Sequence, residues 1–282
     1  MSVKNTMFNI LKLAVAKTDG IFGVEIEAEG RNLPRDLMNW RTENDPSLKS
    51  GEPDKFEYVM PAPLDLDGTH NMLMELKDAY KKNASKVKET DTSGVHVHIN
   101  VQDYTPKELF TFMVTYLTLE ELVLTFCGEM REGNHFCLRV KDAEFILHEF
   151  VKAAEQRQFA HLKNDNIRYA SMNPCSLFKY GSLEFRAMRG TGDIDAIYEW
   201  VEILNEIRLA AKRFKSPDEV VVSISAEGEE NFIRQVLGNK AGLFLKVKNA
   251  KHMVREGARR VQPLAFIPDW GAFKDTKNNP FA

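Results

Sequence analysis

The sequence predicts an α+β fold in which strands with one polar face line a charged cavity. The first observation is the strict alternation of residues 22–29, where Glu25, Glu27 and Glu29 face away from the apolar residues between them. The second is the same alternation in residues 94–100 and 182–187. The third is a set of longer segments between and after these strands whose apolar residues have helical spacing.

The acidic face of the first strand needs an explanation, because Glu is a poor strand residue and neighbouring carboxylates repel each other. An edge strand with a solvated acidic face would show the same pattern. The two later strands favour a shared site instead. His96 and His98 lie on one face of their strand, and Glu184 and Arg186 lie on one face of theirs. We therefore expect a cationic partner for the carboxylates.

A shorter strand is predicted at residues 56–60 and ends before Pro61. It carries Glu57, which shares a face with Val59. Alternation therefore does not decide which way Glu57 points, and on its own Glu57 would be a surface residue.

Helical spacing predicts a short amphipathic helix near the start of the chain and longer helices further on. The best-defined start is Thr105-Pro106-Lys107-Glu108, because Thr caps a helix, Pro suits the first position, and Glu108 can reach back to the cap. The helix that begins there is apolar nearly all round and should be buried against the sheet. The expected helical ranges are 7–16, 69–87, 105–126, 142–159, 193–214 and, with a break near 238–242, 216–260.

The bulk composition is that of an ordinary folded protein. The chain has 282 residues, 43% of them hydrophobic, and a net charge of -3, which argue against long disorder and give no clear nucleic-acid signal. We see no membrane span or export segment. We favour one continuous domain: a catalytic part over 1–215 and a helical C-terminal extension over 216–282, whose function the sequence does not indicate.

The three cysteines, Cys127, Cys137 and Cys175, form no C-x-x-C pair. An odd count without such a pair argues against a disulfide framework and fits a reducing cytoplasm. Each is most simply a small core residue. Cys175 lies near the expected site, so a thiol nucleophile is the alternative there, although no activating pattern surrounds it.

The polar residues of the separate strands would form a metal site if they meet. Carboxylates with one imidazole suit hard divalent cations, Mg²⁺ or Mn²⁺, and suit Zn²⁺ less well. Clustered ions of this kind, with Arg186 as a fixed donor, indicate phosphate chemistry. There is neither a G-x-x-x-x-G-K-[ST] loop nor a strand-linked G-x-G-x-x-G. The five expected metal ligands are Glu25, Glu27, Glu57, His96 and Glu184.

These stretches, taken in order, resemble the amidoligases, a family of carboxylate-amine ligases frequent in phages and bacteria and similar to glutamine synthetase and the glutamate–cysteine ligases. One departure is Pro46, where the family's Asp-Gly-Ser-Leu would place Gly. The matching pieces are Gly23-Val24-Glu25-Ile26-Glu27, Trp40 with Asp45-Pro46-Ser47-Leu48, Glu57-Tyr58-Val59-Met60-Pro61-Ala62-Pro63-Leu64, Gly94-Val95-His96-Val97-His98-Ile99-Asn100, Arg168-Tyr169-Ala170-Ser171-Met172-Asn173, and Ser182-Leu183-Glu184-Phe185-Arg186 with Gly190-Thr191.

The resemblance implies a glutamine synthetase-like, mainly antiparallel sheet curved into an active-site funnel, with helices on its outer face. It implies that the five ligands hold Mg²⁺ bridging ATP, and that Arg186 and Arg168 contact the phosphates. A substrate carboxylate would become an acyl phosphate, and an amine would then displace phosphate to give an amide or isopeptide bond. The implied catalytic residues are Arg186, Arg168 and Glu184, and the implied nucleotide-binding residues are Arg186, Arg168, His98 and Asn173.

The resemblance also implies small-molecule or peptide substrates and a cytoplasmic location, that of the host if a phage encodes the protein. A homo-oligomer stays open. Two other classes of function stay open as well. A metal-dependent hydrolase would use His-x-His with carboxylates to activate water. A structural or virion protein that kept the sheet would gain no stability from ATP and Mg²⁺ together.

Overall fold

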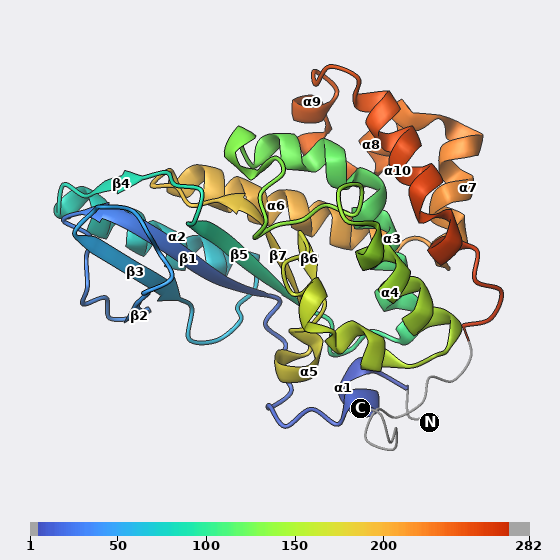
Figure 1. The fold of residues 1–282 in the computed structure, drawn as a ribbon, viewed down its shortest axis with the longest axis horizontal. Helices are drawn as coiled ribbons and strands as arrows, with labels where there is room; N and C mark the ends of the chain where they lie inside the picture. Colours follow the sequence, from blue (N-terminus) through green and yellow to red (C-terminus); the bar gives the residue numbers. More distant parts are fainter. Residues whose placement is uncertain (1–4, 271–282) are drawn as a thin grey trace.

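The computed structural model describes residues 5–270 and shows an α+β fold built around one antiparallel sheet (Figure 1). The strand order is β2-β3-β1-β5-β7-β6, and β4 also pairs with β1. The predicted α+β class is confirmed, whereas curvature of the sheet into a funnel stays a prediction. The strands are β1 (Phe22–Arg31), β2 (Arg41–Asn44), β3 (Asp54–Val59), β4 (Lys86–Lys88), β5 (Gly94–Asn100), β6 (Met172–Asn173) and β7 (Ser182–Arg189).

Helices cover one face of this sheet and continue beyond it as a helical layer (Figure 1). Short 3-10 turns complete several of the connections between β5 and β7. The helices are α1 (Met7–Leu11), α2 (Leu66–Lys82), α3 (Pro106–Val123), α4 (Glu144–Glu155), α5 (Leu177–Tyr180), α6 (Ile194–Ala211), α7 (Pro217–Glu227), α8 (Glu229–Leu237), α9 (Ala241–Phe244) and α10 (Ala250–Ala265).

The apolar face of the sheet packs against helices α2, α3 and α6. The ring of Phe185 on β7 lies 5.7 Å from Phe112 and 4.8 Å from Tyr116, both on α3. Tyr58 on β3 lies 6.0 Å from Tyr80 on α2. The alternation of β1 is therefore real: its apolar residues are buried in this core, and Glu25 and Glu27 are only partly covered on the other face.

Several predicted helices end earlier than the apolar spacing indicated, two of them by five residues. The helix predicted at 69–87 ends at Lys82, and Val87 lies on β4, where it pairs with Gly30. Ala84 turns the chain with a left-handed φ of 50°. The helix predicted at 7–16 ends at Leu11, followed by Lys12 with a φ of 49°. In both places the turn overrides the spacing, because a left-handed residue cannot continue a helix.

Helix α3 is the central helix of the core, and the capping box predicted at Thr105 and Glu108 is present. Within residues 5–270, it is the helix that is long and apolar enough to cross a membrane by length and composition. However, 83% of its apolar 18-residue stretch is buried inside the fold. Its burial against the sheet, predicted from the sequence, is confirmed.

The C-terminal helices α7, α8 and α10 extend this core. Helix α10 approaches α3 so closely that a Cβ on Gly257 would lie 2.1 Å from the carbonyl oxygen of Thr118. Arg255 and Lys251 on its outer face pair with Glu229 and Glu230 of α8, as expected for a solvated helix face. The division into 1–215 and 216–282 stays a prediction, and residues 271–282 lie outside the described part.

Helix α3 also carries a fully buried carboxyl group, that of Glu120. Its two oxygens accept hydrogen bonds from the Ser171 hydroxyl and from the Val140 backbone N–H. Burial raises the pKa of Glu120 from 4.5 to about 7. Between pH 4.5 and about pH 7, Glu120 is therefore protonated in the folded state, whereas in the unfolded chain it has already lost this proton.

Replacing Glu120 by Gln is expected to change how stability depends on pH. Because the unfolded chain binds fewer protons between the two pKa values, the wild-type free energy of unfolding falls as pH rises through this window, by on the order of 3 kcal/mol from this residue. The variant lacks this contribution. Urea unfolding at several pH values between the two pKa values measures the free energy of unfolding of both proteins. The same dependence on pH in wild type and variant would contradict the prediction.

Candidate active site

The polar face of the sheet brings the predicted residues together through strand register. Glu27 on β1 is opposite Glu57 on β3, and Glu25 on β1 is opposite His96 on β5. His98 on β5 is opposite Glu184 on β7. Side chains opposite one another on antiparallel strands share a face. Glu25 and Glu184, which are 159 positions apart in the chain, therefore lie on one surface.

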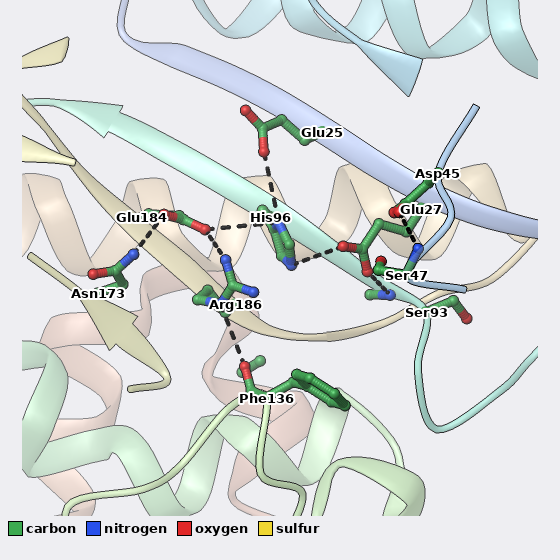
Figure 2. A network of polar contacts seen from close by, with 12 residues as sticks. Glu25, Glu27, Asp45, Ser47, Ser93, His96, Phe136, Asn173, Glu184 and Arg186 are labelled. Carbon is green, nitrogen blue, oxygen red and sulfur yellow. Dashed lines mark hydrogen bonds and ion pairs between the residues drawn. The ribbon is translucent and has the colours of Figure 1, made fainter. Parts of the chain in front are cut away.

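His96 lies between Glu25, Glu27 and Glu184 (Figure 2). These three residues and Glu57, which is opposite Glu27, form the acidic cluster. The Nδ1 atom of His96 lies 3.6 Å from a carboxylate oxygen of Glu25 and 3.6 Å from one of Glu184, and its Nε2 atom lies 3.9 Å from Glu27. These separations are longer than hydrogen bonds. The imidazole therefore lies between three carboxylates and is too far from each of them for a hydrogen bond.

The side chain of Glu57 lies on the same face as the other members of the cluster. Alternation alone had not decided to which face of β3 it points. Burial, together with the charges of Glu25 and Glu27, raises the pKa of Glu57 to about 7. Asp45 adds to this repulsion from the loop after β2, where its carboxylate accepts the Ser47 backbone N–H at 2.8 Å. The cluster thus holds more negative charge than its protein surroundings neutralise.

Glu184 and Arg186 form the opposite side of the cluster. Arg186 donates to Glu184 and to the backbone carbonyl of Phe136 (Figure 2). Glu184 also accepts hydrogen bonds from Asn173 at 2.7 Å and from Ser176 at 2.8 Å. Although burial alone would raise it, the pKa of Glu184 is lowered to about 2, mainly by the charge of Arg186. Asn173 thus orients Glu184, while its amide oxygen accepts the backbone N–H of Cys175 at 2.9 Å.

His98 lies beside the cluster, two residues after His96 on β5. Its Nδ1 atom lies 3.1 Å from the hydroxyl of Ser182, and its Nε2 atom lies 3.5 Å from Glu25. Burial lowers the pKa of His98, but its interaction with Glu25 and the charge of Glu184 outweigh it and raise the pKa overall. The two histidines in turn keep the pKa of Glu25 well below its usual range, despite its burial.

Arg168 lies apart from the cluster. It is exposed, and its guanidinium stacks over the ring of Tyr169 at 5.0 Å. Tyr169 meets the ring of Phe136, whose carbonyl accepts from Arg186. Arg168 therefore lies outside the cluster, and the contacts that connect it with Arg186 pass through the rings of Tyr169 and Phe136. Glu29, at the other end of β1, is fully buried and binds Ser50 and Thr90 instead.

Arg131 is the residue that sequence reasoning missed. It is 2% exposed and donates to three backbone carbonyls, those of Ser93, Arg186 and Ala187. Its guanidinium and the carboxylate of Glu27 both lie within 3.4 Å of the position that a Cβ on Gly94 would take. A fixed cation therefore lies behind the acidic cluster. The only sequence signal was an Arg in a polar loop, which does not reveal burial.

Cys175 lies close to Glu184 but is poorly suited to be a nucleophile. Burial and the charges of Asp165 and Glu184 raise the pKa of its thiol to about 11. The thiolate is the reactive form of cysteine. The three thiols are free, in line with the expectation of no disulfide framework.

The donor chemistry of the cluster fits Mg²⁺ or Mn²⁺, because its members are mainly carboxylates with unbalanced negative charge. Among residues 5–270, no group of three or more His, Cys, Asp or Glu side chains is gathered closely enough to hold an ion unaided. Mg²⁺ is commonly held by one or two carboxylates together with substrate phosphates. The cluster suits ions that arrive with a phosphate ligand better than a closed structural site.

A family described as "putative amidoligase enzyme" matches residues 36–207. The matched segment contains Glu57, His96, Glu184 and Arg186 and begins after β1. No curated protein matches the chain. The match covers strands β2–β7, helices α2–α5 and most of α6, which confirms the resemblance seen in the sequence. The chain therefore belongs to the amidoligase family, a family of ligase-type enzymes.

Proposed function

We propose that the protein is an ATP-dependent carboxylate-amine ligase that works through an acyl phosphate. The observation that carries this proposal is the acidic cluster: four carboxylates from three strands share one face with His96, beside the guanidinium of Arg186. An anionic surface of this kind binds a triphosphate only together with divalent cations, which fits ATP with Mg²⁺ or Mn²⁺.

Each residue of the cluster has a proposed role. Bound Mg²⁺ would neutralise the charge of the phosphates, and its ligands would be Glu25, Glu27, Glu57, His96 and Glu184. Arg186 would donate to the transferred phosphoryl group, because its guanidinium is held in place by Glu184 and the Phe136 carbonyl. Asn173 would act through Glu184 rather than touch the nucleotide.

The proposed reaction has two steps. A carboxylate oxygen of the first substrate attacks the terminal phosphorus of ATP, and ADP leaves with the electron pair of the broken P–O bond. The amine of the second substrate then attacks the acyl carbon, a C–N bond forms, and phosphate leaves. The surplus protons of the amine pass to solvent. The side chains contribute by positioning the groups and balancing their charge. In this proposal Arg168 guides the phosphate or the carboxylate from outside the cluster.

Nucleotide binding by the full chain tests this proposal first. Mg²⁺ with a non-hydrolysable ATP analogue should raise the melting temperature, because a ligand at about 100 times its Kd adds about 2.7 kcal/mol to the free energy of unfolding. Mg²⁺ alone and the analogue alone should do less. ADP release should then appear with members of a panel of carboxylates and amines. Absence of both the stabilisation and the ADP release would overturn the proposal.

The raised pKa of Glu57 predicts that metal binding depends on pH. A pKa of about 7 means that Glu57 is largely protonated at low pH and must lose this proton to bind a cation. Mn²⁺ with the ATP analogue should therefore bind about tenfold more tightly at about pH 8 than at about pH 6. In Glu57→Gln the affinity should be lower and this part of the pH dependence lost. Calorimetric titration measures both, and equal pH slopes in the two proteins would contradict the prediction.

A further inference from the structure

A cavity of about 240 Å³ adjoins the acidic cluster at its Glu25 and His98 corner. It lies between the segment before β1, the loop after β3 and the start of β7. Its wall is largely apolar and includes Val15, Ile21, Met60, Pro61, Pro63 and Tyr180. Pockets for drug-sized ligands usually have about 300–1,000 Å³. This cavity is therefore sized for a molecule like a single amino acid.

The inner end of the cavity is polar and is lined by Glu25 and His98. Glu25 has one carboxylate oxygen directed at His96 in the cluster and the other directed at His98. The Nε2 atom of His98 is buried and has no hydrogen-bond partner within the described part of the chain. The Glu25 carboxylate would give an amine placed here an acceptor and a counter-charge, whereas it would repel a carboxylate. The same position borders the surface proposed for the phosphates.

The mouth of the cavity carries the opposite charge. Arg41 lines it from β2 and is exposed, with Glu43 as its ion-pair partner at 2.8 Å. Lys179 lies over the ring of Tyr180, 4.6 Å from its centre, and is close enough to interact electrostatically with Arg41 and Glu25. The cavity therefore has the Glu25 carboxylate at its inner end, an apolar wall and positive side chains at its mouth.

We propose that this cavity binds the amine substrate of the ligase, as an amino acid with an aliphatic side chain. The amine lies at Glu25 and His98, the side chain lies against the apolar wall, and the carboxylate lies toward Arg41 and Lys179. This assignment rests on the proposed function, because the amine must lie beside the phosphate at which the acyl group is activated. It goes beyond that function by giving the second substrate its chemical class.

Binding of three related probes tests the assignment. In calorimetric titrations of the full chain with Mg²⁺ and the ATP analogue, L-leucine should bind most tightly. Its two analogues, 3-methylbutylamine without the carboxylate and 4-methylpentanoate without the amine, should each bind about tenfold more weakly, since each loses hydrogen bonds to charged groups. Tighter binding of 4-methylpentanoate than of L-leucine would overturn the assignment, because the cavity would then hold the carboxylate substrate.

Two variants separate the cavity from the nucleotide site. Gly23 lines the cavity, and a Cβ there would meet His98 at 3.6 Å, an ordinary contact, so Gly23→Val narrows the inner end without straining the backbone. It should abolish L-leucine binding and leave binding of the ATP analogue unchanged. Arg41→Gln should reduce the preference for L-leucine over 3-methylbutylamine. The matched control is Gly242→Val on helix α9, where a Cβ would meet nothing within 4 Å.

The outcomes distinguish this inference from the function on which it rests. If Gly23→Val loses the ATP analogue instead of L-leucine, the cavity holds the nucleotide base and the inference is wrong. If wild type binds the analogue with Mg²⁺ but none of the three probes, the inference fails while the proposed function stands. If wild type binds no analogue with Mg²⁺, the proposed function fails and the inference falls with it.

Discussion

Replacing Glu27 by Gln is expected to lower the rate of ADP formation about 10²–10³-fold and to remove most of the stabilisation by Mg²⁺ with nucleotide. Glu27 is 14% exposed and accepts the backbone N–H of Gly94 at 2.7 Å. The amide oxygen of Gln can keep this hydrogen bond, so the fold should be preserved. The negative charge is lost, and with it a proposed ligand for the cation that the phosphates need.

The matched control for this prediction is Glu144→Gln, which removes a carboxylate from the exposed first turn of α4. Its ADP formation and its response to Mg²⁺ with nucleotide should equal those of wild type. Steady-state ADP release and thermal unfolding measure both properties. A Glu27→Gln variant as active as the control would show that the acidic cluster is not where the nucleotide and its metal bind.

Replacing Arg131 by Met is expected to destabilise the fold by about 3–5 kcal/mol. The variant keeps an unbranched side chain of similar length, but it removes the donors to the carbonyls of Ser93, Arg186 and Ala187. These carbonyls belong to β7 and to the turn before β5, so both strands lose their support at the site. The acidic cluster also loses a fixed cation that lies behind it. Urea unfolding measures the change.

Two further variants make this prediction specific. Arg131→Lys keeps the charge but cannot reach three carbonyls in fixed directions, so it should recover only part of the stability. Arg234→Met removes an exposed guanidinium that pairs with Glu230 one turn earlier on α8, and it should cost less than about 1 kcal/mol. If Arg131→Met costs no more than Arg234→Met, the buried guanidinium is not what holds β7 and the turn before β5 in place.

The alternating strands show how far sequence reasoning reaches. Alternation in β1, β5 and β7 placed Glu25, His96 and Glu184 on polar faces, because side chains in a strand have a fixed period of two. It left Glu57 undecided, since Glu57 shares a face with Val59. The register between β1 and β3, where Glu27 is opposite Glu57, resolves this. Register depends on both strands at once and cannot be obtained from one strand.

The helix ends show a second limit. Apolar spacing carried the helix predicted at 69–87 past Lys82, because Val87 continues the pattern by chance. The actual end is set by a left-handed residue at Ala84, which is not a typical residue for that conformation. The start of α3 was predicted correctly, because Thr105 and Glu108 specify a capping box by local chemistry alone.

The sequence by itself determined the α+β class, the polar faces of the strands and, through its ordered motifs, the amidoligase family. These depend on local periodicity and on residue types in order. Only the tertiary structure decided that Glu29 is withdrawn from the cluster, that Arg168 lies outside it, and that Arg131 is a buried cation behind the site. Each of these depends on partners distant in the chain, and burial is a property of the packed whole, which no single segment encodes.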